Sequence, residues 1–278
     1  IYLNKNFMQN SIKEINFNNS EINSSYLEMV RHVQSLPVIL FTVNARGGSA
    51  FFHSLLDGNK QIINLPEIRT EWDYLKHSDR ISSELVAERF SARNPELFNS
   101  SLNIIEGWDS LGENNNQFVK VDTNIFKKHF SLLFKHIKKD EKNIFLIIHI
   151  AYSLTCNYDP MEGVILFYHL HKPRKISEPY VPNGLNYRLL HITRDPRIGF
   201  VRYQESVKIE KSSWHIKSLD HMGNKLYKSP SRLFSNFKSI VSQVQIYKNK
   251  SNSLKVFTLE DLHEKRIRIL NDIFINYN

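Results

Sequence analysis

The stretch PVILFTVNARGGSAFFHSLLD, residues 37–57, decides the fold class. Residues 38–43 are a short, continuous apolar run rich in β-branched side chains, which is typical of a strand buried on both faces of a parallel sheet. Residues 44–48 form a turn with two glycines, and residues 49–57 place apolar side chains at helical spacing before Gly58. The stretch therefore predicts a strand, a glycine-containing turn and a helix.

Other apolar runs along the chain predict further strands, separated by helices. The strand signals fall in residues 61–65, 143–153, 164–170, 187–193 and 254–259. Apolar residues at helical spacing predict helices over residues 125–137 and 231–247. Strands that alternate with helices indicate an α/β fold, with a mostly parallel sheet flanked by helices in three layers. Ligands of such sheets bind beyond the carboxyl ends of the strands, so residues that follow a strand are the candidates for a site.

The length of the chain, 278 residues, suits one large domain. We expect residues 1–278 to form a single domain with its core at about 37–262. Residues 1–36 begin with an Asn- and Ser-rich stretch of weak periodicity, so they are predicted to form an irregular N-terminal arm.

The apolar runs and the cysteine content bear on the compartment. No apolar run approaches the ~20 residues of a membrane-spanning helix, and the first residues lack the long apolar block of a secretion signal. Cys156 is the only cysteine, which excludes an intrachain disulfide and a zinc site with several thiolates. We therefore expect a soluble, cytoplasmic protein with no transmembrane segment and no bound metal.

The charge of the chain favours an anionic partner. There are 37 Lys and Arg residues against 28 Asp and Glu residues, a formal net charge of +9. Nucleic acid, acidic glycan and nucleotide are all compatible with this excess. No nucleic-acid-binding motif is present, and no basic tract is interleaved with stacking aromatic residues, so we expect no nucleic-acid partner.

The turn after the first strand has the composition of an anion-binding loop. Backbone N–H groups of a glycine turn and the dipole of the following helix converge on a bound anion. Against the pattern GxxxxGK[ST] of kinases and ATPases, the first Gly is Val43, the Lys is Ser49 and the Ser/Thr is Ala50. The residue that would hold magnesium is absent, so transfer of a metal-bound triphosphate is disfavoured. A simple strand-to-helix connection is the alternative interpretation of this turn alone.

Four segments, in the same order along the chain, resemble the sulfotransferase superfamily. ARGGSA (45–50) is similar to its 5'-phosphosulfate loop, and LLDGNKQIINLPE (55–67) to the helix and turn that follow. LLHITRDPRIGFV (189–201) is similar to its second signature, and VFTLEDL (256–262) to a strand and turn near the carboxyl end. The resemblance runs from about residue 37 to residue 262, with a loose middle third. It implies a P-loop NTPase-like sulfotransferase fold and the co-substrate 3'-phosphoadenosine-5'-phosphosulfate (PAPS).

The resemblance also implies which residues bind PAPS. The residues expected on its 5' side are Arg46, Gly47, Gly48, Ser49 and Ala50. Arg194 is expected to bind the 3'-phosphate. The family usually has a second 3'-phosphate ligand, a Ser, eight residues after that arginine, and this chain has Arg202 there, with Ser206 as a weaker substitute. An arginine can donate two parallel hydrogen bonds to a phosphate, so Arg202 either takes this role or points into solvent.

The acceptor hydroxyl needs a base, for which several residues compete. Glu67, with Arg69 two residues later, resembles the Glu-x-Arg of tyrosylprotein sulfotransferases, in which the carboxylate deprotonates the acceptor beside a helping arginine. A structural ion pair between the two is the alternative. His169 and His171 lie two apart at a strand end and share one face of the sheet, so they are further candidates. His53, one turn into the first helix, faces either the site or the core.

The remaining candidates concern the sulfuryl group and the acceptor. Lys120 resembles the lysine that stabilises the bridging oxygen in many members of the family, and Lys172 is its competitor. Arg69 and Trp72 are candidates for acceptor binding, because an indole can stack on a sugar ring, although a core position explains a tryptophan equally well.

The sequence therefore predicts a sulfotransferase that moves a sulfuryl group from PAPS to a hydroxyl acceptor by in-line displacement. Sugar, lipid-headgroup and phenol or tyrosine acceptors remain open, because fold similarity does not carry substrate identity. Two other classes are weighed against it: a P-loop-like kinase of a small molecule, and a non-catalytic basic module that binds nucleic acid or acidic glycan.

Overall fold

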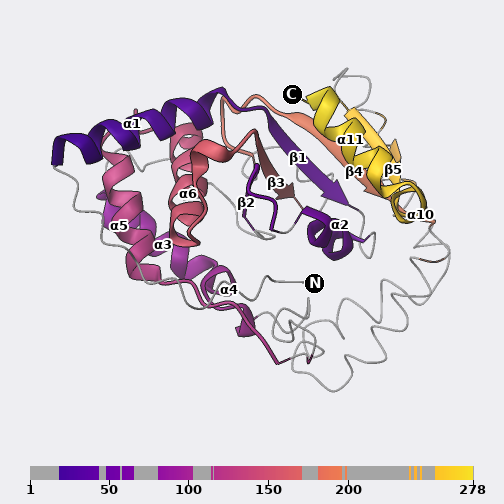
Figure 1. Cartoon of the computed structure of the whole chain (residues 1–278), viewed down its shortest axis with the longest axis horizontal. Helices are drawn as coiled ribbons and strands as arrows, with labels where there is room; N and C mark the ends of the chain where they lie inside the picture. Colours follow the sequence, from indigo (N-terminus) through magenta and orange to yellow (C-terminus); the bar gives the residue numbers. More distant parts are fainter. Residues whose placement is uncertain are drawn as a thin grey trace.

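The computed structural model of the chain describes residues 19–43, 48–56, 58–65, 81–102, 114, 116–170, 181–195, 198, 238, 241–242, 245 and 254–277. The described residues form a parallel β-sheet with helices on both of its faces (Figure 1). This arrangement confirms the α/β class expected from the sequence. That residues 1–278 form one domain stays a prediction.

Five strands make up the sheet in the described part of the chain. They are β1 (Val38–Val43), β2 (Ile62–Asn64), β3 (Ile165–Leu170), β4 (Arg188–Thr193) and β5 (Leu254–Thr258). Their spatial order is β2-β3-β1-β4-β5, and every neighbouring pair is parallel. Each of these strands lies where an apolar run of the sequence predicts one.

The central strand β1 is the point at which the winding of the chain reverses. From β1 the chain moves outward to β2 and returns to β3, and it then crosses β1 to reach β4 and β5. At the carboxyl edge, Val43 of β1 is in register with Ile192 of β4, and Thr193 is in register with Thr258 of β5. Doubly wound sheets bind their ligands at such reversals.

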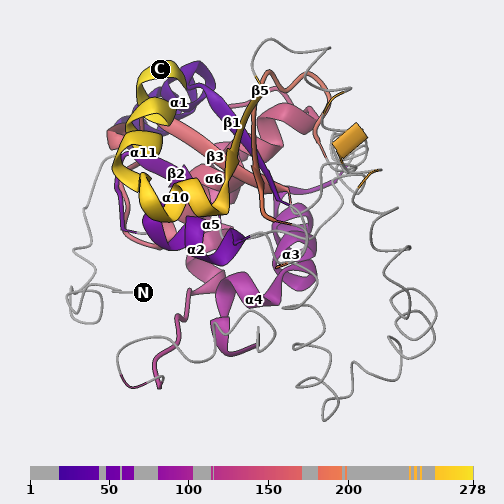
Figure 2. The same cartoon turned by 90° about the vertical axis from the view of Figure 1, so that its right-hand side faces the viewer.

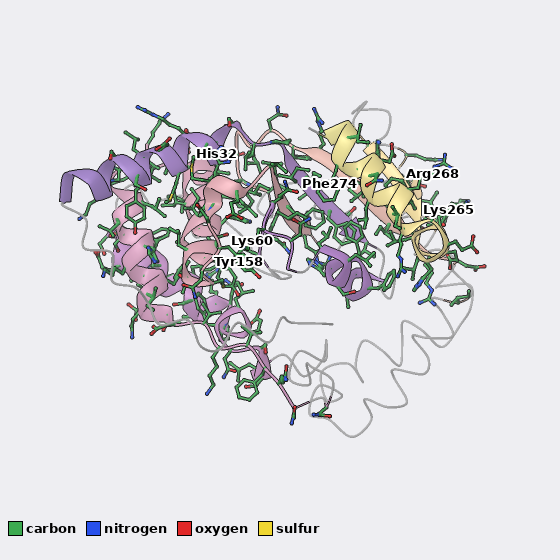
Figure 3. All side chains as sticks on the ribbon, viewed as in Figure 1. His32, Lys60, Tyr158, Lys265, Arg268 and Phe274 are labelled. Atoms are coloured by element: carbon green, nitrogen blue, oxygen red, sulfur yellow. The ribbon has the colours of Figure 1, made fainter. Side chains whose placement is uncertain are left out.

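Helices cover both faces of the sheet (Figure 2). One layer contains α1 (Asn19–Ser35), α3 (Ser83–Arg93), α4 (Pro95–Phe98), α5 (Thr123–Phe134) and α6 (Glu141–Thr155), with the short 3-10 helices η4 (Ser100–Leu102) and η5 (Pro160–Glu162). The other layer contains α2 (Ser49–Leu56), α10 (Leu259–Glu264) and α11 (Arg266–Tyr277). Figure 3 shows Phe274 on the sheet side of α11, where it packs against the core, and the exposed Arg268 on the outer side.

Side chains that alternate along the strands supply two apolar clusters, one on each face of the sheet. Leu40 and Tyr168 belong to the cluster with α1, α3, α5 and α6, whereas Phe41 and Phe167 belong to the cluster with α2, α10 and α11. Every residue of β1 and of β3 is buried. This burial on both faces explains why these strands are continuous apolar runs with no polar alternation.

The prediction of a strand over residues 143–153 is wrong, because this segment lies inside helix α6. Asp140 caps the helix, because its carboxylate accepts a hydrogen bond of 2.9 Å from the amide of Asn143. All residues from Ile144 to Ser153 are buried, so the helix has no polar stripe that would reveal its period. A short apolar run of this kind cannot be assigned by periodicity alone.

The irregular arm predicted for residues 1–36 is also wrong over its second half, where α1 occupies residues 19–35. Val30 and Val33 of α1 are buried in the core, and the His32 ring is hydrogen-bonded to the Gly163 carbonyl at 2.8 Å. Tertiary packing therefore stabilises a helix whose own periodicity is weak. Residues 1–18 lie outside the described residues.

The structure bears on two predicted helices and on the expected absence of a membrane-spanning helix. The helix predicted over residues 125–137 is confirmed as α5. The helix predicted over residues 231–247 lies mostly outside the described residues, and helical conformation is assigned there at positions 238, 241, 242 and 245. In the described part of the chain, no helix has both the length and the apolar character needed to cross a membrane.

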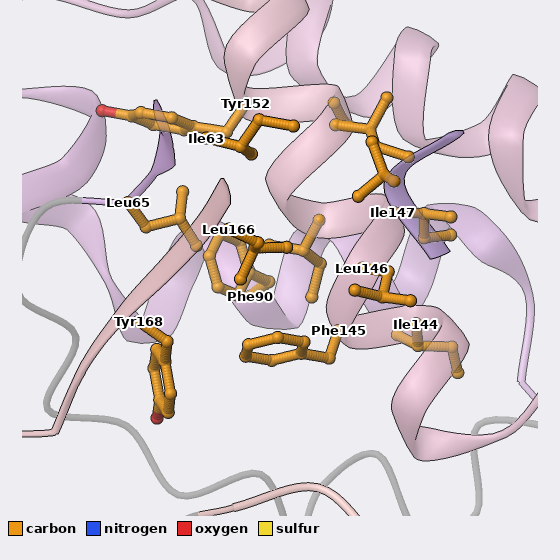
Figure 4. Close-up of a cluster of buried hydrophobic side chains, with 14 of the residues drawn as sticks. Ile63, Leu65, Phe90, Ile144, Phe145, Leu146, Ile147, Tyr152, Leu166 and Tyr168 are labelled. Carbon is orange, nitrogen blue, oxygen red and sulfur yellow. The ribbon is translucent and has the colours of Figure 1, made fainter. Parts of the chain in front are cut away.

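Packing of α6 on the sheet generates a first prediction (Figure 4). Phe145 is fully buried, and the centroid of its ring lies 5.1 Å from the ring centroid of Tyr168 on β3. Phe145→Ala is expected to lower the free energy of unfolding by about 3–5 kcal/mol, because the truncation loses apolar burial and leaves a cavity. Urea unfolding followed by circular dichroism measures the loss.

The matched control is Phe118→Ala, since the Phe118 side chain is 39% exposed. Its cost is expected to be about 1 kcal/mol or less. Equal losses for the two variants would contradict the packing of α6 against β3.

Candidate functional site

The candidate site lies at the carboxyl edge of β1, β4 and β5. Because Val43 is paired with Ile192, and Thr193 with Thr258, the strands β1, β4 and β5 end side by side at this edge. Neighbouring strands of a sheet are about 4.8 Å apart, so residues that leave adjacent strand ends begin within one side-chain length of each other. The segment after β5, helix α10, starts at the same edge.

Gly48 is the residue of the glycine turn that the structure describes, and its backbone has φ +92°. This left-handed conformation is easy for glycine and strained for other residues. The Gly48 carbonyl accepts a hydrogen bond of 3.0 Å from the amide of Phe52, so helix α2 begins directly after it. The amides of Ser49, Ala50 and Phe51 therefore precede the first intrahelical bond, as in helix ends that bind anions.

Helix α10 packs against the start of α2. The Leu259 side chain fills the space beside the Gly48 α-carbon, and one turn later the His263 ring stacks on the Phe51 ring with a centroid distance of 4.0 Å. Thr258 caps α10, because its hydroxyl oxygen accepts a hydrogen bond of 3.0 Å from the Asp261 amide. The helix after β5 thus contacts Gly48 and the first turn of α2.

Gly48→Ala tests this contact and is expected to destabilise the protein by about 2–4 kcal/mol. A Cβ at Gly48 would overlap Leu259 Cδ1 and lie 2.8 Å from its Cδ2, in addition to the strain of the positive φ. Thermal unfolding of the purified variant measures the loss.

Gly58→Ala isolates the backbone effect, because Gly58 has φ +74° and a Cβ there would meet nothing within 4 Å. We expect it to cost about 1 kcal/mol. If both variants lost the same stability, Leu259 would not restrict the turn.

Arg194, the candidate ligand of a 3'-phosphate, directly follows β4 at this edge. Its side chain is 23% exposed, and its Nε lies 4.0 Å from Oε1 of Glu260 on α10. Arg194 and Gly48 thus belong to one edge of the sheet, each in contact with the first turn of α10. Ser49 and Ala50 also lie at this edge, in the first turn of α2.

His169, a candidate base, lies near the end of β3 on the sheet face that α2 covers. Its ring is 1% exposed and packs against the Phe41 ring, with a centroid distance of 4.7 Å. His169 Nδ1 and His53 Nε2 of α2 are 2.9 Å apart, so one ring nitrogen donates a hydrogen bond to the other. The structure therefore places both histidines in the interface between the sheet and α2.

Lys120, the candidate for stabilising the bridging oxygen, lies in a different part of the described structure. It is exposed, pairs with Asn99 in an isolated antiparallel bridge, and places its Nζ 5.3 Å from the Phe118 ring centroid. These contacts join it to the segment after α4. Its role in chemistry stays a prediction.

Several candidates lie outside the described residues. They are Arg46, Gly47, Glu67, Arg69, Trp72, His171, Lys172, Arg202 and Ser206. Their roles stay predictions. Of the residues proposed from the sequence, the described structure brings together Gly48, Ser49, Ala50 and Arg194 at one edge.

Sequence reasoning missed the residues of α10 and a buried polar pair. The resemblance included the segment 256–262 but gave no role to Leu259 or Glu260, and a substitution pattern at these positions could have revealed one. Thr42 and His191, at the ends of β1 and β4, face each other with 2.9 Å between Oγ1 and Nδ1. Polar residues inside apolar strands were the available signal for this pair.

Two other observations concern metals and thiols. Among the described residues, no group of three or more His, Cys, Asp or Glu side chains is placed to hold a metal ion. Burial raises the pKa of the Cys156 thiol to about 12, so this thiol is not nucleophilic near neutral pH.

Two buried histidines predict acid sensitivity. Burial lowers the pKa of His149 and of His191 to about 4 each, against an ordinary value of 6.5. The unfolded chain therefore takes up these protons as the pH falls from about 6.5 to 4, and the folded state does not. The free energy of unfolding should drop through this window, by roughly 3 kcal/mol for each histidine.

Urea unfolding at several pH values, compared between wild type and His149→Leu, measures the contribution of His149. The variant should lose less stability between pH 6.5 and 4, because its unfolded chain has no histidine at position 149 to take up a proton. An identical pH dependence of both proteins would contradict the buried, neutral state of His149.

Comparison with protein-family models, with curated proteins and with solved structures returned no match for this chain. The functional argument therefore depends on the geometry of the site and on the sequence motifs.

Proposed function

We propose that this chain is a sulfotransferase that moves a sulfuryl group from PAPS to a hydroxyl acceptor. The observation that carries the proposal is the meeting of two anion-binding elements at one sheet edge. Strand β1 ends at Val43, helix α2 begins at Ser49, directly after Gly48, and Arg194 follows the adjacent strand β4. A nucleotide is longer than the spacing of two strands, so one molecule can contact both elements.

In this proposal the two elements bind opposite ends of PAPS. The amides at the start of α2, with the Ser49 hydroxyl, hold the 5'-phosphosulfate oxygens, and Arg46 adds a cation. Arg194 binds the 3'-phosphate through charge-assisted hydrogen bonds. The absence of a Lys at position 49 and of a Ser or Thr at position 50 disfavours the kinase alternative.

The proposed reaction is an in-line displacement at sulfur. The acceptor oxygen forms a bond to sulfur while the bond between sulfur and the 5'-phosphate oxygen breaks, and that electron pair leaves with 3',5'-ADP. A base takes the proton of the acceptor hydroxyl. Glu67 is our candidate for this base, because the burial of His169 against α2 makes that ring a poor contact for an acceptor. Lys120 or Lys172 would stabilise the bridging oxygen.

The acceptor itself is proposed only by class: a sugar, a lipid headgroup, or a phenol or tyrosine. Arg69 and Trp72 are the candidates for acceptor binding. The proposal also includes the P-loop-like character of the fold and a cytoplasmic location, which suits a chain with a single cysteine.

Nucleotide binding tests the proposal directly. 3',5'-ADP is expected to raise the melting temperature of the protein, because a ligand that binds only the folded state stabilises it, and ATP with magnesium should do so far less. Arg194→Ala should weaken 3',5'-ADP binding roughly 10- to 100-fold, since a hydrogen bond to a charged group contributes about 1.5–3 kcal/mol. Isothermal titration calorimetry measures the affinity.

Arg188→Ala is the matched control, because Arg188 lies at the opposite end of the same strand. It should leave the affinity for 3',5'-ADP unchanged. Equal stabilisation by ATP with magnesium would favour the kinase. A salt-sensitive complex with DNA or RNA that 3',5'-ADP does not disturb would favour the binding module. Turnover of PAPS with glycan, lipid-headgroup and phenol acceptors then identifies the acceptor class.

A further inference from the structure

The first two residues of α10 contact both halves of the candidate site. Leu259 packs beside Gly48, at the turn after β1, and Glu260 faces Arg194, at the end of β4. The next residue, Asp261, is engaged within its own helix, where its carboxylate accepts hydrogen bonds from the Thr258 hydroxyl at 2.7 Å and from Lys265 at 2.9 Å. Glu260 is thus the acidic group of this turn that lies against Arg194.

The distance between Arg194 and Glu260 defines the kind of interaction. Nε and Oε1 are 4.0 Å apart, which is too long for a hydrogen bond and short enough for a direct Coulomb attraction. The Glu260 side chain is 44% exposed, whereas that of Arg194 is only 23% exposed. At this distance Glu260 supplies a negative charge beside the guanidinium without a hydrogen bond to Nε.

We propose that Glu260 is a counter-charge to Arg194. Its carboxylate repels a phosphate that binds Arg194 and thereby limits the affinity of this site for anions. A phosphate that binds Arg194 must lie within a few ångströms of the Glu260 carboxylate, and the two anions repel. The carboxylate does not touch the reacting atoms. It acts through the repulsion between its charge and the anion that Arg194 binds.

Removing this charge should tighten anion binding. Orientation of the guanidinium by Glu260 would have the opposite effect, so weaker phosphate binding by Glu260→Gln would favour that role. Combined with the proposed function, on which this step rests, the counter-charge weakens the hold of the enzyme on the 3'-phosphate of 3',5'-ADP and speeds release of this product.

Inorganic phosphate tests the counter-charge without any nucleotide. Glu260→Gln should bind phosphate roughly three- to tenfold more tightly than wild type, measured by thermal shift against chloride at matched ionic strength. Glu264→Gln is the matched control, because it makes the same charge change one turn later on the exposed side of α10. Arg194→Gln combined with Glu260→Gln should abolish the gain. Glu260→Ala, which also lacks the charge, repeats the test in a second variant.

The comparison of 3',5'-ADP with 5'-AMP extends the test to the proposed ligand. Glu260→Gln should tighten binding of 3',5'-ADP several-fold and leave 5'-AMP unchanged, because only the former has a 3'-phosphate. A simple structural role of Glu260 would change both affinities together. The gain should decrease at high salt.

The outcomes separate the two proposals. Equal phosphate affinities for Glu260→Gln and Glu264→Gln, weaker phosphate binding by Glu260→Gln, or no phosphate binding by any variant would each overturn the counter-charge. If wild type and Glu260→Gln show the expected phosphate difference but neither binds 3',5'-ADP, the counter-charge stands and the sulfotransferase proposal fails.

Discussion

The hydrogen-bonded register of β1 between β3 and β4 is the constraint on which the rest of the structure depends. It pairs Leu40 with Tyr168 on one side and Val43 with Ile192 on the other, so both halves of the sheet are aligned to one central strand. Because β1 is buried on both faces, each helix layer needs it for its core. The same register brings the ends of β1, β4 and β5 to a common edge, where Gly48 and Arg194 lie.

At that edge, the turn and the arginine are held by contacts from a distant part of the chain. Helix α10 begins more than 200 residues after Gly48, yet Leu259 fits beside it and Glu260 lies next to Arg194. The small size of glycine has two uses here: it permits a positive φ and it admits Leu259. The proposed anion site is assembled from three strand ends, so its geometry depends on the integrity of the whole sheet.

The histidines illustrate how burial changes the meaning of a polar residue. His169 lies near the end of the apolar strand β3, but α2 covers it and its ring is hydrogen-bonded to that of His53. His149 and His191 are enclosed so completely that their neutral forms are strongly favoured. The buried rings therefore bear on stability and its pH dependence, and the proposed chemistry is assigned to residues after the strands.

The sequence by itself determined the strand β1, the helix α2 and the other strands of the sheet, because buried parallel strands are short, continuous apolar runs. It failed at α6, since a helix buried on all sides also lacks a polar stripe, and at α1, whose weak pattern is stabilised by Val30 and Val33 in the core. Only the tertiary structure decided the order of the strands, the covering of His169 by α2 and the meeting of Leu259 and Glu260 with Gly48 and Arg194. These contacts join residues far apart in the chain, and local periodicity carries no information about such distances.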